Sequence, residues 1–534
     1  MRKKSVIAAV AAICICCLCF FAGCENYDYY EHPEKTYEKG HEFDEGCGNY
    51  NNGYDKESEE VDRLISVVPS QVQLDFMELE YYNFIHFGMN TMTGAEWGTG
   101  DEDPALFNPS SLDTDQWCEA LKASGSKGII ITAKHHDGFC LWQTETTEQS
   151  IKNSPYKNGN GDVVKELSES CEKYGLKLGI YLSPWDMNAE TYGTNAYNEF
   201  YMDQLRELLG GEYGPDFDGD GKGEIFCVWM DGARGEDVEM DKDFAYDLEA
   251  WEALIRELQP GCVVANQGSD VRWVGNEAGS SRESEWNVVS KGNAANTNWQ
   301  GSVDEADDLQ AVDASAEDVG SRELLAKYQD LVWYPSEVDV SIRKGWFWHS
   351  NEKPKSLDQL LNIYYKAVGG NSSLLLNVPP NKDGLIDEKD VEVLAEFGEE
   401  IARTTAKLAN VTSISVGDNE GLTEKPELYN LLDESTYDGY TFEDNEYIIE
   451  FKLSGKMQLG RIDLREDSRS SQRVEEFEVW VLSEDGWELI GDSTVIGNRR
   501  ILLFEDAPES DTVRVVIKQS RSVPVLRSVK LYAK

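Results

Sequence analysis

A single carboxylate follows an apolar run at residues 226–230 of the chain. The run, Phe-Cys-Val-Trp-Met, is typical of a buried β-strand, and Asp231 and Gly232 come directly after it. Parallel α/β folds keep their catalytic groups at the carboxyl ends of such strands. Asp231 is therefore a candidate catalytic acid, while an aspartate in a turn that caps the following helix would show the same local pattern.

Three glutamates further along the chain are candidates for a partner carboxyl group. Enzymes that hydrolyse a glycoside with retention use two carboxyl groups about 5–5.5 Å apart, one as the nucleophile and one as the acid/base. Glu277 lies close to Trp273, whose indole could raise its pKa, and between glycines that permit a tight loop. Glu283 and Glu285 are rivals a few residues later, and the sequence leaves the choice among the three open.

Two of the six histidines, His135 and His136, are adjacent at the end of another apolar run. Neutral imidazoles can donate hydrogen bonds to sugar hydroxyl groups and accept them, so this pair suits a sugar pocket. His86 ends the first predicted strand, where it is either a pocket residue or a histidine of the core. No further ligands stand at a spacing that suits a metal, so no metal site is expected here.

An acidic segment at 216–221, Asp-Phe-Asp-Gly-Asp-Gly, resembles the start of a calcium-binding loop. The twelfth position of such a loop would be Cys227, which lacks the bidentate carboxylate that calcium requires. We therefore interpret residues 216–224 as an acidic surface loop and expect no metal cofactor.

Strand-like runs alternate with helical stretches between residues 62 and 405. Alternation at this spacing indicates a parallel sheet with crossover helices, and seven or eight strands in one run favour a (β/α)8 TIM barrel. No Gly-x-Gly-x-x-Gly motif follows the first strand, which argues against a dinucleotide-binding fold. The predicted strands are 82–88, 128–133, 176–182, 225–230, 262–266, 337–341 and 373–378, and the predicted helices include 115–123, 163–174, 195–209 and 244–258.

Short alternating runs replace this pattern after about residue 408. They are separated by turns rich in Gly, Asp and Ser, with no long helix between them, which is typical of an antiparallel β-sandwich. At 534 residues the chain is too long for one core. We predict a catalytic domain at 62–405 and a β-sandwich at 406–534.

The start of the chain has the pattern of an export signal. Positive charge at residues 2–4 precedes an apolar run that ends in Phe-Ala-Gly-Cys at Cys24, as in a bacterial lipoprotein signal. Residues 1–23 are the predicted signal peptide, and the run is short for the other interpretation, a transmembrane helix. Residues 24–61 are acidic without apolar periodicity, which predicts a solvated tether. We expect an exported protein, anchored through lipid on Cys24 at the bacterial cell surface or facing the periplasm.

The net charge of −51 limits the partners of the chain. It argues against nucleic acid, because a phosphate backbone needs a basic counter-surface. It also disfavours direct binding to anionic lipid, so membrane contact is expected only through the anchor. The cysteines beyond the signal are scattered without Cys-x-x-Cys spacing, which excludes a zinc site and a dense disulfide framework of the usual kinds. A neutral or polar substrate fits this composition.

Seven motifs stand in order along the first predicted domain. They are Tyr-Asn-Phe-Ile-His-Phe-Gly at 82–88, Glu-Trp at 96–97, Lys-His-His-Asp-Gly-Phe at 134–139, Gly-Ile-Tyr-Leu-Ser-Pro-Trp-Asp at 179–186, Val-Trp-Met-Asp-Gly at 228–232, Arg-Trp-Val-Gly-Asn-Glu at 272–277 and Ser-Ile-Arg-Lys-Gly-Trp-Phe-Trp-His at 341–349. Together they resemble the α-L-fucosidases of glycoside hydrolase family 29. The later motifs look most like the branch that removes α-1,3/1,4-linked fucose from branched glycans.

The resemblance implies a (β/α)8-like catalytic domain followed by a β-sandwich, and a retaining mechanism without a cofactor. Asp231 aligns with the nucleophile, and Glu277 is the match for the acid/base. The residues that would bind fucose or line the adjoining subsites are His86, Glu96, His135, His136, Tyr181, Trp185, Trp229, Arg272, Trp346 and His349. The expected substrate is a fucosylated oligosaccharide or glycoconjugate. The C-terminal part resembles a discoidin-type, carbohydrate-binding-like sandwich.

Two other functions compete with this one. A non-catalytic glycan-capture lipoprotein on the same scaffold would have lost one catalytic carboxylate, whereas both candidates are present. A glycosidase for galactose or for another deoxy-sugar would keep both carboxylates and differ in its sugar pocket.

Overall fold

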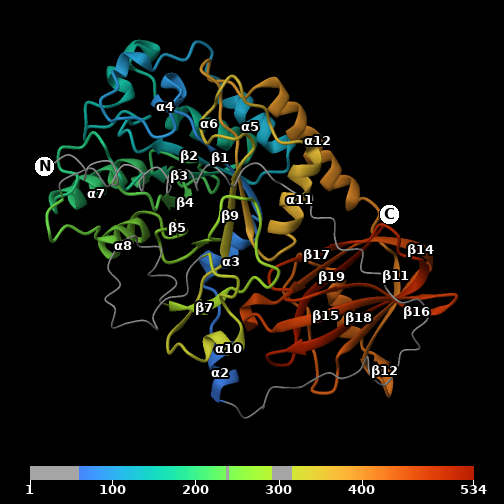
Figure 1. Cartoon of the computed structure of the whole chain (residues 1–534). Helices are drawn as coiled ribbons and strands as arrows, with labels where there is room; N and C mark the ends of the chain where they lie inside the picture. Colours follow the sequence, from blue (N-terminus) through green and yellow to red (C-terminus); the bar gives the residue numbers. More distant parts are fainter. Residues whose placement is uncertain (1–58, 236–239, 292–314) are drawn as a thin grey trace, which may run out of the picture.

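The computed structural model describes residues 59–235, 240–291 and 315–534 (Figure 1). The predicted signal at 1–23 and the predicted tether up to residue 58 lie outside the described residues. Within these ranges, no helix is both long and apolar enough to cross a membrane. The helices α2 (Glu59–Ile65) and α3 (Gln71–Met77) precede the first strand.

Eight parallel strands form a nearly closed barrel in the order β5-β4-β3-β2-β1-β10-β9-β6. A parallel bridge between Ala265 and Val271 brings the two outer strands of this order together. The predicted barrel of alternating strands and helices is confirmed. Its strands are β1 (Tyr81–Ile85), β2 (Gly128–Lys134), β3 (Lys177–Leu182), β4 (Ile225–Met230), β5 (Val263–Asn266), β6 (Arg272–Trp273), β9 (Ser336–Ser341) and β10 (Ser373–Asn377).

Amphipathic helices cover the outside of the barrel (Figure 1). Asp113, Asp162 and Asp247 cap three of them by accepting a hydrogen bond from the backbone three residues on. Because Asp247 is the cap of its helix, that helix begins later than the predicted residue 244. The covering helices are α5 (Thr114–Ala123), α6 (Val163–Tyr174), α7 (Ala196–Leu209), α8 (Leu248–Leu258), α11 (Leu357–Ala367) and α12 (Glu388–Thr404).

The strands of the barrel are buried on both faces. Every residue of β2 and of β4 is buried, as expected for parallel strands that carry helices outside and side chains inside. Aromatic rings fill much of the interior, and Phe84, Tyr181 and Trp229 contact one another there. A floor of packed rings therefore lies below the carboxyl ends of the strands.

The eighth strand, β6, is absent from the predicted set because it contains only two residues. A short loop with no helix joins it to β5, so neither the period of a strand nor an alternation with helices marks it in the sequence. After β6 the chain makes an excursion before β9. This excursion contains the antiparallel pair β7 (Val288–Ser290) and β8 (Leu331–Trp333), and the short helix α10 (Arg322–Leu325).

Antiparallel strands form the C-terminal part of the chain, as predicted. The long strand β14 joins two layers, since it pairs with β11 and β18 in one and with β17 and β19 in the other. A second apolar core lies between the layers. The strands are β11 (Val411–Asp418), β12 (Gly421–Glu424), β13 (Tyr440–Thr441), β14 (Ile448–Glu466), β15 (Val474–Ser483), β16 (Gly486–Ser493), β17 (Arg500–Leu503), β18 (Glu509–Ser520) and β19 (Val525–Ala533).

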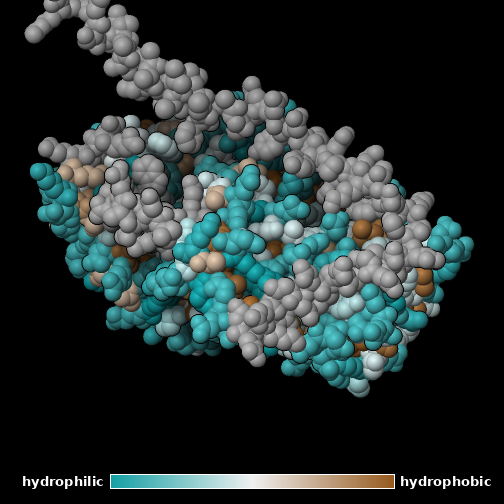
Figure 2. Space-filling view, turned by 60° about the horizontal axis from the view of Figure 1, so that its bottom comes forward, coloured by the Kyte–Doolittle hydropathy of each residue, from teal (hydrophilic) through white to brown (hydrophobic). Residues whose placement is uncertain are grey.

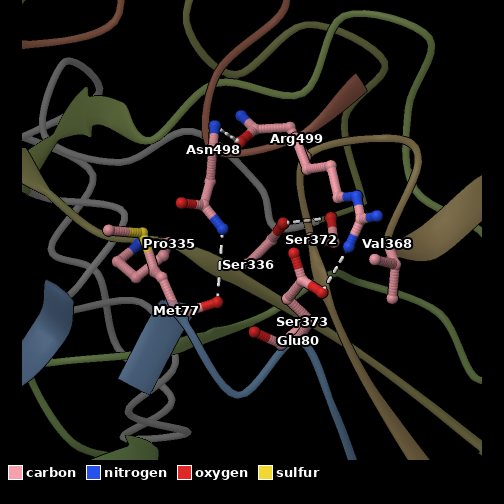
Figure 3. Close-up of a pocket in the computed structure, with 10 residues that line it drawn as sticks. Met77, Glu80, Pro335, Ser336, Val368, Ser372, Ser373, Asn498 and Arg499 are labelled. Carbon is pink, nitrogen blue, oxygen red and sulfur yellow. Dashed lines mark hydrogen bonds and ion pairs between the residues drawn. The ribbon is translucent and has the colours of Figure 1, made fainter. Parts of the chain in front are cut away.

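The sandwich packs against the end of the barrel where β1, β9 and β10 begin (Figure 3). Glu80, directly before β1, forms ion pairs with Arg499 at 2.6 Å and with Arg465, both from the sandwich. A cavity of about 10 Å³, room for about one water, lies beside this ion pair. On the face that Figure 2 shows, the described residues are mainly polar, with scattered apolar side chains.

Candidate active site

Asp231 follows the last residue of β4, and its side chain is one quarter exposed. Its Oδ2 accepts a hydrogen bond of 3.0 Å from the Tyr181 hydroxyl and lies 3.9 Å from Nε2 of His136. Its Oδ1 accepts a hydrogen bond of 2.7 Å from the backbone N–H of Ala233. The turn interpretation and the catalytic interpretation thus use different oxygens, and the first helix after Asp231 in the described residues, α8, begins only at Leu248. A carboxylate oxygen has two lone pairs, so Oδ2 can face a ligand while it accepts the hydrogen bond from Tyr181.

Three buried histidines surround this carboxylate from the ends of β1 and β2. A polar side chain holds the Nδ1 of each ring: Asn377 at 2.9 Å for His86, Asn90 at 3.2 Å for His135, and Ser183 at 2.7 Å for His136. Their rings pack closely, with centroids 4.0 Å apart for His135 and His136 and 5.9 Å apart for His86 and His135. The two predicted neighbours in sequence therefore face the same site, together with His86.

Burial keeps these imidazoles neutral. It lowers the pKa of His86 to about 4 and holds the pKa of His135 well below its usual range. Burial also lowers the pKa of His136, although the charge of Asp231 opposes this effect. A neutral ring with its Nδ1 already bonded leaves Nε2 free to donate to a sugar hydroxyl or to accept from one.

The hydrogen-bond network assigns the tautomers of two of these rings. The amide nitrogen of Asn377 donates to Ser341 and to the carbonyl of Trp346, so its oxygen accepts from His86. Ser183 donates to the carbonyl of Trp185, so its hydroxyl oxygen accepts from His136. Both rings then carry their proton on Nδ1, and their Nε2 atoms are acceptors for sugar hydroxyl groups.

A second side of the site comes from the segment that follows β9. Glu96 accepts from the backbone N–H of Trp346 at 3.0 Å and pairs with Nε2 of His349 at 2.6 Å. The Trp346 ring lies 5.1 Å from the ring of His86. The structure therefore brings the predicted residues Glu96, Trp346 and His349 together and joins them to the histidine group.

Trp229 forms the floor next to Asp231. Its ring stacks on Tyr181 with centroids 5.3 Å apart and an interplanar angle of 14°, and its Nε1 donates to Oε1 of Glu337 at 2.7 Å. Glu337 accepts a second hydrogen bond from Tyr82. Since Tyr181 also donates to Asp231, this chain of contacts links a buried carboxyl of β9 to the catalytic candidate.

The predicted residue Trp185 lies at the rim of the site. Its ring is 4.7 Å from that of His136 and 5.7 Å from that of Trp97. Trp97 is 60% exposed, although it follows Glu96 directly. Two indoles therefore stand at the opening, where one ring is accessible to solvent.

Glu277 lies on a loop four residues beyond Trp273 and is exposed as a residue, and the pKa of its carboxyl group is raised. Burial raises its pKa, and the charges of Asp231 and Glu96 raise it further, while a hydrogen bond with Trp346 lowers it. The carboxyl group thus faces the other residues of the site. A carboxyl group with a raised pKa can serve as a general acid near neutral pH.

The rival Glu285 has a different role. It is fully buried and pairs with Arg272 and, at 3.0 Å, with Arg282, and these charges outweigh its burial and lower its pKa. The other rival, Glu283, is exposed and lines a separate cavity of about 810 Å³ next to the sandwich. Among the three predicted candidates, the structure brings only Glu277 to Asp231.

Arg272 is a predicted pocket residue whose side chain is buried. Its side chain is 1% exposed and donates to the carbonyls of Tyr334 and Trp286 as well as to Glu285. Nε and Nη2 of the guanidinium are therefore committed to these partners at the start of β6, and the role of Arg272 in lining the pocket or an adjoining subsite stays a prediction. Neighbouring side chains of a strand point to opposite faces. Trp273 rather than Arg272 therefore faces the interior of the barrel, where it donates to Asp339 at 2.8 Å.

Several residues of the site are absent from the predicted set. Five polar residues hold other site residues by hydrogen bonds, Asn90, Ser183, Glu337, Asp339 and Asn377, and the exposed Trp97 contacts Trp185 at the rim. Glu337, Asp339 and Ser341 alternate along β9 and point to the same face, so their period in the sequence was a usable signal. The others act through tertiary contacts that no local pattern marks.

The acidic loop before β4 contains the one cluster of potential metal ligands found in the described ranges. Carboxylate oxygens of Asp216, Asp218 and Asp220 lie within 4.8 Å of one another. This loop lies at the start of β4, whereas Asp231 follows its end, so the strand of six residues, about 20 Å long, separates the two. Any ion held there would stand apart from the catalytic candidates.

The comparisons with known proteins agree with this geometry. A sequence profile described as Alpha-L-fucosidase matches residues 70–404. The chain is similar to "Alpha-L-fucosidase 1" of Arabidopsis thaliana, with 38% identity over 475 residues that cover 87% of each protein. It is similar to the crystal structure of a putative α-L-fucosidase from Bacteroides ovatus, with 42% identity and a TM-score of 0.77 over 90% of this chain and 76% of that one. It also resembles a GH29 fucosidase of Ruminococcus gnavus in complex with fucose, with 28% identity and a TM-score of 0.72 over 91% of this chain and 98% of that one.

Proposed function

Because the chain belongs to the α-L-fucosidase family, glycoside hydrolase family 29, we propose that this α-L-fucosidase releases terminal α-1,3/1,4-linked L-fucose by a retaining double displacement. The observation that supports the mechanism best is the pair formed by Asp231 and Glu277. Asp231 carries the hydrogen bond from Tyr181, and Glu277 has a raised pKa to which the charge of Asp231 contributes. A nucleophile and an acid are thus distinguished by their surroundings.

In the first step, the carboxylate of Asp231 attacks the anomeric carbon of fucose. The bond from that carbon to the glycosidic oxygen breaks, and Glu277 transfers its proton to the departing oxygen. The product is a glycosyl ester on Asp231, and Glu277 is left as a carboxylate.

In the second step, Glu277 takes a proton from water, and the water oxygen bonds to the anomeric carbon as the ester bond to Asp231 breaks. Ester formation removes the negative charge of Asp231, which is one of the charges that raise the pKa of Glu277. The acid of the first step therefore becomes more acidic afterwards, and the same group is suited to act as a base.

The sugar hydroxyls would be bound by His86, His135, His136 and Glu96, which converge on the space in front of Asp231. The Nε2 acceptors of His86 and His136 and the carboxylate of Glu96 suit a polyhydroxylated ring. The rings of Trp346 and Trp229 offer an apolar wall for the methyl group that distinguishes fucose from galactose.

The preference for α-1,3/1,4 linkages rests on the motifs at 272–277 and 341–349, which resemble that branch of the family. The rim indoles of Trp185 and Trp97 are suited to contact the rest of a branched glycan. Cleavage of Lewis a and Lewis x glycans, compared with α-1,2-fucosylated glycans, tests this preference. Equal or faster release from the α-1,2-linked substrates would contradict it.

Asp231→Ala and azide rescue test the catalytic pair. Asp231→Ala should abolish hydrolysis of an aryl α-L-fucoside with the fold intact, and Asp220→Ala, in the acidic loop, is the matched control. Azide should restore activity to Glu277→Ala but not to Glu283→Ala or Glu285→Ala. Rescue in either of the latter two, or full activity of Asp231→Ala, would overturn the assignment.

The rival function, glycan capture without catalysis, is disfavoured because both carboxyl groups are present and the charge of Asp231 raises the pKa of Glu277. Pure protein that binds fucosylated glycans without releasing fucose would favour the rival. A glycosidase for galactose is tested by the same assay with aryl galactosides.

Export and anchoring through lipid on Cys24 form a further part of the proposal. The support is the signal pattern of residues 1–23 and the acidic stretch that follows it. Wild-type protein should fractionate with membranes after expression in a bacterium, and Cys24→Ala should not. Equal distribution of the two proteins would exclude the anchor.

A further inference from the structure

The loop that carries Glu277 is closed at its base by Glu285. The Glu285 carboxylate accepts from the backbone N–H of Arg282 at 3.1 Å and pairs with the Arg282 and Arg272 guanidinium groups. Arg282 also donates to the carbonyl of Val274 at 3.0 Å, so the outgoing and returning limbs of the loop are joined. This closure fixes the shape of the loop base.

A buried amide of the sandwich holds the returning limb in place. Gln472, 1% exposed, donates through Nε2 to the carbonyl of Glu285 at 3.0 Å and accepts through Oε1 from the N–H of Asn287 at 2.9 Å. Its side chain thus pairs with the backbone of the limb as a neighbouring strand would. Gln472 lies 187 residues beyond Glu285, in the segment between β14 and β15.

Two more sandwich side chains hold the carbonyl of Glu283. Thr494 donates to it at 2.7 Å and Arg500 at 3.0 Å. Both side chains donate to a backbone carbonyl. These hydrogen bonds therefore depend on the backbone conformation of the limb and not on its side chains. The limb from Glu283 to Asn287 is therefore held by three residues of the C-terminal domain.

Asn371, between α11 and β10, ties this contact to the barrel. Its Nδ2 donates to the Glu285 carbonyl at 2.8 Å, and its Oδ1 accepts from the backbone N–H of Asn498 in the sandwich at 2.6 Å. Gly497 packs so tightly here that an added Cβ would lie 2.2 Å from the Asn371 side chain. Figure 3 shows the adjoining part of this interface, where Asn498 bonds to Met77.

Glu277 is separated from these anchors by a short stretch of chain. Five residues, 278–282, lie between Glu277 and the anchored limb, and Ser281 among them donates to the carbonyl of Lys366 in α11 at 2.6 Å. Five residues span at most about 18 Å. Gly279 packs against Ile363 of α11 with a φ of +79°, so this stretch has little room to shift. Movement of the anchored limb would be transmitted to Glu277.

We propose that the C-terminal sandwich positions the acid/base carboxyl, with Gln472 and Thr494 as positioning residues that act through the backbone of residues 283–287. This inference rests on the proposed role of Glu277. The sandwich then contributes to catalysis from the end of the barrel opposite to the active site. A displacement of about 1 Å of a catalytic group can lower a rate about 100-fold, so modest loosening of the limb should be measurable.

The test uses the dependence on the leaving group, because general acid catalysis matters most for a poorly activated one. The kcat/KM values for phenyl α-L-fucoside and for 2-chloro-4-nitrophenyl α-L-fucoside are measured for full-length Thr494→Val and Gln472→Leu. Thr494→Ser keeps the hydroxyl and should retain wild-type behaviour. Tyr437→Phe is the matched control, since Tyr437 donates from the sandwich to Glu78 at 3.0 Å, away from the limb.

We expect Thr494→Val and Gln472→Leu to lose about tenfold or more in kcat/KM on the phenyl substrate and about twofold or less on the activated one. Equal losses on both substrates, or the same pattern in Tyr437→Phe, would overturn the proposal. Thr494→Val removes one exposed hydrogen bond, so it carries the test if Gln472→Leu does not fold.

Glu277→Ala, measured in parallel, separates this proposal from the function on which it rests. If Glu277→Ala shows the leaving-group dependence and Thr494→Val does not, the positioning role is wrong and the acid/base assignment stands. If Glu277→Ala shows no such dependence, the assignment of the acid itself is wrong.

Discussion

The buried carboxyl group of Glu337 should make the free energy of unfolding of the protein depend measurably on pH. Burial raises its pKa to about 7 from an ordinary value of 4.5, although Tyr82 and Trp229 donate hydrogen bonds to it. Between these pH values the folded protein keeps a proton that the unfolded chain has released. Glu337 therefore favours the folded state most below pH 4.5, and this contribution is lost as the pH rises to about 7.

The size of the effect follows from the two pKa values. A difference of about 2.5 pKa units at about 1.36 kcal/mol per unit comes to about 3 kcal/mol. Glu337→Gln removes the titrating proton and keeps the shape of the side chain and an acceptor for Trp229. Between about pH 5 and about pH 8, the free energy of unfolding of the wild type should thus fall by about 2–3 kcal/mol relative to this variant.

Denaturant unfolding at constant ionic strength across this pH range measures the difference. Groups that do not interact with Glu337 titrate alike in both proteins and cancel when the two curves are subtracted, whereas the charge of Glu337 contributes to the raised pKa of its neighbour Asp339. Glu388→Gln, a change on the exposed side of α12, is the control and should give a curve parallel to the wild type. Parallel curves for wild type and Glu337→Gln would refute the reasoning, because Glu337 would then bind protons equally in the folded and unfolded states.

Three further predictions concern catalysis. Tyr181→Phe removes the hydrogen bond to Asp231, about 1.5–3 kcal/mol for a charged acceptor, so kcat/KM should fall about 10- to 100-fold; an unchanged kcat/KM would contradict the contact. The value of kcat/KM should fall at basic pH, because Glu277 must be protonated to act as the general acid. Glu96→Gln should move this loss of activity to lower pH, since it removes a charge that raises the pKa of Glu277. Trp346→Phe should move it to higher pH, since it removes a hydrogen bond that lowers that pKa. Shifts of the two variants in the same direction would refute this. EDTA should leave kcat/KM unchanged, because the acidic loop lies at the other end of β4; a loss that calcium restores would contradict this separation.

The barrel could be predicted because its longer strands carry continuous apolar runs. Every residue of β2 and of β4 is buried, and these strands are accordingly composed mainly of apolar residues, which the sequence shows directly. The two-residue strand β6 could not be recognised, since its place in the barrel depends on pairing with β9. Asp231 could be placed for the same reason as β4, because it stands immediately after a strand that the sequence defines.

The position of Arg272 has a tertiary cause. Its partner Glu285 and the carbonyl of Trp286 come from the returning limb of the Glu277 loop, and the carbonyl of Tyr334 comes from the segment between β8 and β9. No local pattern distinguishes a buried arginine from one that faces a pocket. The same ion pair removes Glu285 from the candidates for the acid. The contacts of Gln472 join positions nearly 190 residues apart and leave no periodic signal. Glu337 differs, because acids at alternate positions of an apolar strand are unusual and could have been noticed.

The central claim is that Asp231 forms a covalent bond to the sugar. A 2-deoxy-2-fluoro-fucosyl fluoride slows breakdown of such an intermediate, so the labelled protein can be digested and the modified residue located by mass spectrometry. We predict one fucosyl label per protein, on the peptide that contains Asp231, and none on Asp231→Ala. A label on another carboxylate, or turnover by the wild type with no covalent adduct and with inverted product, would contradict the account.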